Sequence, residues 1–97
     1  MSLTSKERAK LRSQANDMET ILQVGKGGII DTLLVQIEDA LKAREMIKIR
    51  VLETAPVSPK EASVIIAENL GCDIVQVIGT RVVLYKENKK EPKFKKK

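Results

Sequence analysis

The glycine-rich stretch Val24–Ile29 holds the residues whose types and spacing best suit the binding of an anion. Glycine reaches positive φ at low cost and, because it lacks a Cβ, lets another backbone approach closely. A glycine-rich link between a strand and a helix also directs free backbone N–H groups outward, at the positive end of the helix dipole. Lys26 adds one mobile ammonium at the tip of this turn. The segment from Gly25 to Gly28 is therefore a candidate cradle for a phosphate group.

The same glycines have a structural explanation, because connections from a strand to a helix need tight turns. These residues alone leave both explanations open. Two known phosphate-binding motifs are excluded. The P-loop needs four residues between its glycines and then Lys followed by Ser or Thr, and the dinucleotide fingerprint needs a glycine where Ile30 stands.

Few residues in this chain could support catalysis. The 97-residue sequence contains no histidine, which excludes Ser-His and Cys-His nucleophile systems and histidine-ligated metal sites. The single cysteine, Cys72, cannot form an internal disulfide and is expected to be a small buried hydrophobe. The carboxylates are scattered among basic residues and form no catalytic constellation. We therefore expect a protein that is not an enzyme and that needs no cofactor, metal or small-molecule substrate.

The excess positive charge is concentrated in one segment. The formal net charge is +5, and residues 86–97 contain seven lysines and two glutamates, so this segment alone accounts for the excess. Within the rest of the chain, residues 4–16 carry four basic side chains against a single glutamate. Because the positive charge is concentrated in these two segments, we expect the partner to be polyanionic. No apolar run is long enough to span a membrane and no signal-peptide pattern is present, so we expect a cytoplasmic protein with no membrane partner.

Three segments have the periodicity and the end signals of helices. Residues 4–15 begin with Thr4 followed by Glu7, the pattern of a capping box. Residues 58–70 open with Ser-Pro-Lys-Glu, which places Ser at the N-cap, Pro at N1 and Glu at N3, and Gly71 follows as a stop signal. Residues 30–44 have apolar side chains at the i, i+3, i+4 and i+7 positions of a core-facing stripe. The members of this stripe are Ile30, Leu33, Leu34, Ile37, Ala40 and Leu41.

Four segments are predicted as strands, namely residues 20–24, 46–52, 72–78 and 81–86. In the second, apolar side chains alternate with Lys48 and Arg50, so one face should be buried and the other basic. The order α-β-α-β-α-β-β contains two crossovers, which are expected to be right-handed and to place both crossover helices on one face of the sheet. We therefore predict an α/β fold (α+β-like, two-layer) with a four-stranded mixed sheet and three helices. The first helix, which belongs to neither crossover, can then cover part of the opposite face of the sheet.

Four segments together resemble the CRM domain, named for chloroplast RNA splicing and ribosome maturation, in its bacterial single-domain YhbY-like form. The resemblance spans about residues 3–86, and the segments occur in the order and at the spacing of the family. It implies a fold similar to the C-terminal domain of bacterial translation initiation factor three. The segments are Leu3-Thr4-Ser5-Lys6 with Leu11-Arg12, then Val24–Ile29, then Glu45–Ile49, and finally Gln76–Lys86.

The resemblance also implies a function. The G-x-x-G loop of the family falls on Gly25–Gly28 and is similar to the backbone-clamping loop of KH domains. Family members bind structured RNA, and the bacterial form is associated with precursors of the large ribosomal subunit. The resemblance thus implies a non-catalytic RNA-binding protein whose partner is ribosomal RNA or a large-subunit precursor particle during ribosome assembly. The candidate RNA-binding residues are Gly25, Lys26, Gly27, Gly28, Lys6, Arg8, Lys10, Arg12, Lys48, Arg50, Arg81 and Lys86.

Two positions depart from the pattern of the family. Ile30 stands where Thr or Ser often caps the following helix, so Gly28 or Asp31 is expected to cap it instead. Lys86 stands where Arg is common, which keeps the charge but gives up a bidentate fork.

The composition of the chain favours one mode of recognition. Tyr85 and Phe94 are the only aromatic residues, so base stacking on an RRM-type platform is not available and binding would rest on phosphate contacts and RNA shape. An alternative function is a protein-interaction module whose basic first helix docks an acidic partner and whose tail serves solubility. In either case we predict a domain over residues 1–86 and a disordered lysine-rich tail over residues 87–97.

Overall fold

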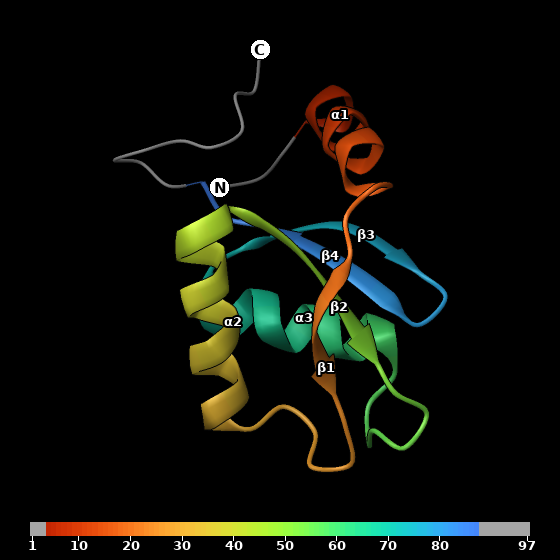
Figure 1. The fold of residues 1–97 in the computed structure, drawn as a ribbon, viewed down its shortest axis with the longest axis vertical. Helices are drawn as coiled ribbons and strands as arrows, with labels where there is room; N and C mark the ends of the chain where they lie inside the picture. The colour runs from red at the N-terminus through yellow and green to blue at the C-terminus, as the bar shows by residue number, and fades with distance from the viewer. Residues whose placement is uncertain (1–3, 88–97) are drawn as a thin grey trace.

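The computed structural model describes residues 4–87. The predicted lysine-rich tail lies, apart from Glu87, outside the described residues. The observed element order and the predicted one agree, and each predicted boundary is within one residue of the observed one. None of the helices within residues 4–87 is long and apolar enough to cross a membrane. The elements are α1 (Ser5–Ala15), β1 (Thr20–Val24), α2 (Asp31–Arg44), β2 (Met46–Val51), α3 (Pro59–Leu70), β3 (Asp73–Ile78) and β4 (Arg81–Tyr85) (Figure 1).

The four strands form one mixed sheet in the order β1-β2-β4-β3. The first two strands are parallel, as predicted, while β4 is antiparallel to both of its neighbours. The predicted link at Gly79 and Thr80 joins β3 to β4 as a tight hairpin, with Gly79 at φ 58°. Strand β4, the last strand within residues 4–87, therefore lies inside the sheet, between β2 and β3, and α3 passes over it.

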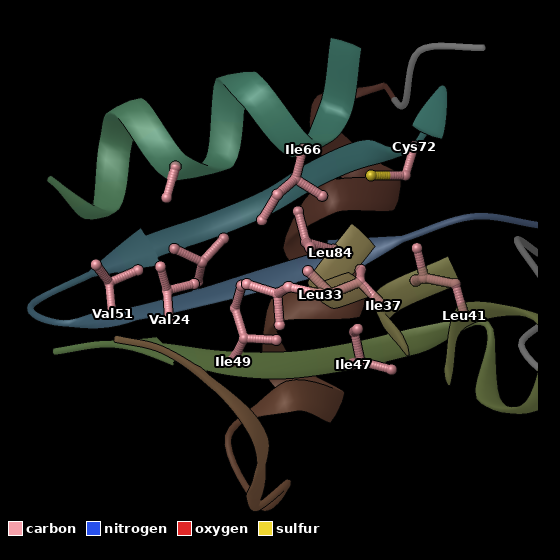
Figure 2. Packing of buried hydrophobic residues seen from close by; sticks show 12 residues of the cluster. Val24, Leu33, Ile37, Leu41, Ile47, Ile49, Val51, Ile66, Cys72 and Leu84 are labelled. Atoms are coloured by element: carbon pink, nitrogen blue, oxygen red, sulfur yellow. The ribbon is translucent and has the colours of Figure 1, made fainter. Parts of the chain in front are cut away.

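Helices α2 and α3 both pack against one face of the sheet, as predicted from the two crossovers. Apolar side chains from the two helices and from the strands meet between them and are excluded from solvent (Figure 2). Sheet residues on this face alternate along each strand with residues of the opposite face. The buried members of this core are Val24, Leu33, Ile37, Leu41, Ile47, Ile49, Val51, Ala62, Ile66, Cys72, Val82 and Leu84.

Helix α1 packs on the opposite face of the sheet and covers only one end of it. Its two buried residues, Leu11 and Ala15, pack with buried side chains of β2, β3 and β4, and Met18 packs against this cluster from the connection that follows. The members of this second, smaller core are Leu11, Ala15, Met46, Val75, Val83 and Tyr85. The other end of this face is left open.

Candidate functional site

The glycine-rich stretch forms a tight turn at the end of β1, at the lower end of the molecule in Figure 1. The backbone N–H of Gly28 donates a hydrogen bond to the Gly25 carbonyl over 2.9 Å. Lys26 and Gly27 are the two central residues, both exposed, and neither has positive φ, as in a type I turn. Their backbone N–H groups have no backbone acceptor within residues 4–87. The tip of the turn thus offers two backbone donors and one ammonium to solvent.

The fold requires a glycine at only one of the three glycine positions in this turn. Gly28 has φ +74°, and a Cβ there would lie 2.9 Å from Cγ of Pro56, so the fold requires a residue without a side chain. A Cβ on Gly27 would meet nothing within 4 Å, and at Gly25 it would make an ordinary 3.9 Å contact with Leu52. Neither of these two has positive φ. The structural explanation therefore accounts for Gly28 and leaves Gly25 and Gly27 available for the approach of another backbone.

The start of α2, directly after this turn, has no side-chain cap. Ile30 occupies the N-cap position in an extended conformation, and its aliphatic side chain accepts no hydrogen bond. The prediction that Gly28 or Asp31 caps this helix is therefore wrong, and so is the placement of Ile30 in the core stripe, because its side chain is 52% exposed. By contrast, Thr4 and Ser58 cap their helices with complete capping boxes. The first N–H groups of α2 thus add to the positive potential beside the turn.

The basic residues predicted on β2 point away from the α2 and α3 core, toward the face that α1 partly covers. Lys48 lies half-buried in mid-strand, and Arg50 is exposed near the end of the strand. Arg50 is paired with Gln23 on β1 and with Arg81 on β4, and Arg81 is paired in turn with Ile78 on β3. All four side chains of this row are exposed. We call Gln23, Arg50, Arg81 and Ile78 the open row.

The four basic residues of α1 lie at the other end of the molecule from the glycine turn (Figure 1). Lys6 and Lys10 are exposed. Arg8 and Arg12 are half-buried, and Nε of Arg8 is buried with no hydrogen-bond partner in the described part of the chain. The structure thus divides the predicted residues into a group on α1 and a group around the turn and the open row, with Lys48 between them.

Lys86 lies apart from both groups. Its ammonium donates a hydrogen bond to the Leu70 carbonyl at the end of α3 over 2.8 Å, and its backbone N–H donates to the Glu45 carbonyl. A cation at this position satisfies an otherwise unpaired helix-terminal carbonyl and complements the helix dipole. Lys86 therefore has a structural role on the α3 side of the sheet, and its contact with RNA stays a prediction.

The buried reactive groups offer no catalytic centre. Burial raises the pKa of the Cys72 thiol to about 11, so the thiol is neutral and unreactive near pH 7. Burial, assisted by the charge of Glu45, raises the pKa of Tyr85 to about 12. Because the Tyr85 ring is fully buried, it cannot stack on a base. Within the described residues no cluster of acidic, cysteine or histidine side chains could hold a metal ion.

The fold and this site define a small α/β domain with a backbone-donor turn and a basic row at one end of its sheet. The chain belongs to the CRS1/YhbY (CRM) domain family, whose model matches residues 3–86. The predicted family and fold are thereby confirmed.

Two curated relatives and one solved structure extend this comparison. The chain is 41% identical over 87 residues to the probable RNA-binding protein YqeI of Bacillus subtilis (strain 168), covering 90% of this chain and 91% of that protein. It is 25% identical over 93 residues to the probable RNA-binding protein PA4753 of Pseudomonas aeruginosa, covering 96% and 89%. The solution structure of the hypothetical protein SAV1595 from Staphylococcus aureus matches with a TM-score of 0.76 and 41% identity, covering 89% of this chain and 90% of that one.

Proposed function

We propose that this chain is a non-catalytic RNA-binding protein that acts in assembly of the large ribosomal subunit, with ribosomal RNA or a precursor particle as its partner. Family membership supports this proposal, as do relatives named as probable RNA-binding proteins at 41% and 25% identity. The association of the bacterial members with large-subunit precursors motivates the choice of RNA.

The observation that carries the proposal is the exposed tip of the glycine turn, where Gly27 has no side chain. Gly27 is exposed, has open space where a Cβ would stand and does not need positive φ, so folding gives no reason for a glycine there. A phosphate that approaches this tip meets the free N–H groups of Lys26 and Gly27, the ammonium of Lys26 and the uncapped start of α2. Backbone N–H groups and a helix N-terminus together form a common phosphate-binding arrangement.

The proposed binding mode is contact with the RNA backbone. Tyr85 is the one aromatic residue in the described part of the chain and it is fully buried, so an exposed stacking platform is missing there. Sequence-specific recognition of unstacked bases usually relies on such platforms. Without an exposed aromatic side chain, the described surface would recognise RNA through its phosphates and its shape.

Three variants of the turn test this proposal. Lys26→Ala should remove one phosphate contact, lower the slope of log affinity against log salt by about 1, and weaken binding similarly for all RNAs. Gly27→Asp should cost more, because it places a side chain and a negative charge where the phosphate must approach. Gly27→Ala is the matched control that adds a Cβ without a charge. All three should keep the melting temperature of the wild type, since Lys26 is exposed and a Cβ on Gly27 would meet nothing within 4 Å.

The measurements are affinity for a structured fragment of large-subunit ribosomal RNA and the thermal melting curve. Normal RNA binding by a folded Gly27→Asp protein would falsify the clamp at this turn. The part in ribosome assembly is tested by gradient fractionation of cell extract. The protein should sediment with large-subunit precursors, and sedimentation with a ribosome-free acidic protein instead would favour the protein-interaction alternative.

A further inference from the structure

Two arginines of the open row lie directly opposite each other on neighbouring strands. Arg50 of β2 is the register partner of Arg81 of β4. The next residue of β2, Val51, donates its N–H to the Thr80 carbonyl over 2.7 Å. Ladder pairs in antiparallel strands alternate, so Arg50 and Arg81 form the non-hydrogen-bonded kind of pair, with Cα atoms about 4.5 Å apart and side chains at their closest. The register therefore places the two arginine side chains next to each other on the exposed face of the sheet.

Nothing in the described structure balances these two charges. Their row neighbours, Gln23 and Ile78, are neutral. Neither guanidinium forms an ion pair within residues 4–87, and Glu53, the first carboxylate after β2, pairs with neither. The adjacent row of the same face, Thr20, Lys48, Val83 and Gln76, adds a further positive charge and no carboxylate. Like charges directly opposite each other destabilise a sheet, so this pair opposes folding.

We infer that Arg50 and Arg81 together bind a phosphate of double-stranded RNA. This inference rests on the proposed function and deepens it by naming the kind of RNA. A phosphate between the two guanidinium groups removes their mutual repulsion and accepts charge-assisted hydrogen bonds from both. The two arginines thus destabilise the sheet when no RNA is bound, and a bound phosphate removes that destabilisation.

The shape of the open row favours a duplex over a single strand. The row crosses all four strands, a width of about 14 Å at the usual strand spacing, with its charges in the middle. It presents no aromatic side chain, so the bases of a single strand would find nothing to stack on. A duplex offers a regular line of phosphates and ribose hydroxyls that needs no stacking partner.

The position of the row connects it to the glycine turn. Gln23 of the open row lies two residues before Gly25, so the row and the turn occupy the same end of the sheet. Helix α1 covers the row that contains Met46 and Tyr85, about 13 Å further along the strands. An RNA backbone held at the turn can therefore continue across the open row toward the exposed lysines of α1.

The test compares Arg50→Gln, Arg81→Gln and the double variant with Arg44→Gln. Arg44 is a matched control, because it is an exposed arginine at the end of α2, away from the open row. Without RNA and at low salt, Arg50→Gln and Arg81→Gln should each raise the melting temperature, and the increase should vanish at high salt as the repulsion is screened. Arg44→Gln should not raise it, because it removes a cation that suits a helix C-terminus.

The second measurement uses a blunt RNA duplex and one of its separated strands as probes. Wild type should prefer the duplex. Each single variant should bind the duplex about tenfold more weakly, as expected for the loss of one hydrogen-bonded charge. The double variant should lose less than the product of the two single losses, because both arginines hold the same phosphate.

Different failures point to different errors. If Arg50→Gln and Arg81→Gln bind the duplex like Arg44→Gln while Gly27→Asp still loses affinity, the arginine site is wrong and the proposed function stands. A wild-type preference for the single strand would overturn the duplex assignment. A wild type that binds no RNA would overturn the proposed function and this inference together.

Discussion

The sheet face covered by α2 and α3 and the face covered by α1 differ in how completely they are buried. The first core contains twelve buried residues, contributed mainly by α2, α3, β1, β2 and β4, and the second contains six. Because burial of apolar area is the main source of folding free energy, most of the stability should come from the α2 and α3 face. The α1 face can then carry unbalanced charge at its open end without losing the fold.

Two neighbouring pairs on the same strands illustrate this difference. Ile49 and Val82 are register partners of β2 and β4 on the closed face, and both are fully buried. One residue further along, Arg50 and Arg81 are partners on the opposite face, and both are exposed. The same two strands thus support the core and the candidate RNA surface. A change on one side should therefore be separable from a change on the other.

The largest expected effect comes from Ile37→Ala on the closed face. Ile37 is fully buried in the larger core, so the substitution should lower the free energy of unfolding by about 2–5 kcal/mol. RNA affinity of the folded fraction should not change, because the side chain is remote from the open face. Denaturant unfolding and RNA titration would measure the two quantities. Val35→Ala, on an exposed position of the same helix, should change stability by less than about 0.5 kcal/mol. A loss of RNA affinity by folded Ile37→Ala protein would contradict the separation of the faces.

A smaller effect on stability is expected from Leu11→Ala on the α1 face. The cost should be near the lower end of the range for such substitutions, about 2 kcal/mol, because the second core is small and lies beside solvent. Here RNA affinity should fall as well, since the substitution loosens the helix that carries Lys6 and Lys10. Gln14→Ala, an exposed change on the same helix, is the control and should leave both quantities unchanged. If Leu11→Ala cost as much as Ile37→Ala, the two cores would be energetically equal and the comparison would be wrong.

The smallest effect concerns the capping box at the start of α3. Hydrogen bonds from the backbone and side chain of Ser58 lower the pKa of Glu61 below its ordinary value of 4.5. A carboxylate with a lowered pKa in the folded state stabilises the fold above its unfolded pKa, and that contribution disappears as pH falls through the folded value. Wild type should therefore be slightly more stable than Glu61→Gln at neutral pH, and the two should converge in acid. Thermal melts of both proteins across about pH 2–7, at constant ionic strength, would measure this difference in stability. A difference that persisted unchanged at the acid end would rule out the charge of Glu61 as its cause.

Much of the fold follows from local patterns in the sequence. The capping boxes at Thr4 and Ser58 have strict residue requirements and were predicted correctly, as was the stop at Gly71. The alternation along β2 correctly predicted that Ile47, Ile49 and Val51 are buried, whereas the burial of Met46 under α1 was not predicted. These features depend on residues close in sequence, so periodicity and end signals are sufficient to find them. The cap of α2 was predicted wrongly, because Ile30 occupies the N-cap position without a side chain that can accept a hydrogen bond.

The site could be predicted only as a set of residue types. Lys26, Arg50 and Arg81 were identified as basic candidates, but the sequence does not say that β4 inserts beside β2. The direct opposition of the two arginines depends on that strand order and register. In the same way, the clash that makes Gly28 indispensable involves Pro56, which is distant in sequence, so the different roles of the glycines could not be separated beforehand.

The position of β4 inside the sheet has a consequence for how the protein is made. During synthesis β2 and β3 leave the ribosome before β4, yet each is paired with β4 in the finished sheet. Until Tyr85 has emerged, the facing backbone groups of both strands lack their partners, and the sheet cannot close. Arg81 arrives on this same strand, so a nascent chain has only half of the arginine pair. The sheet and the proposed arginine site are therefore completed at the same step, when β4 has emerged and paired with both of its neighbours.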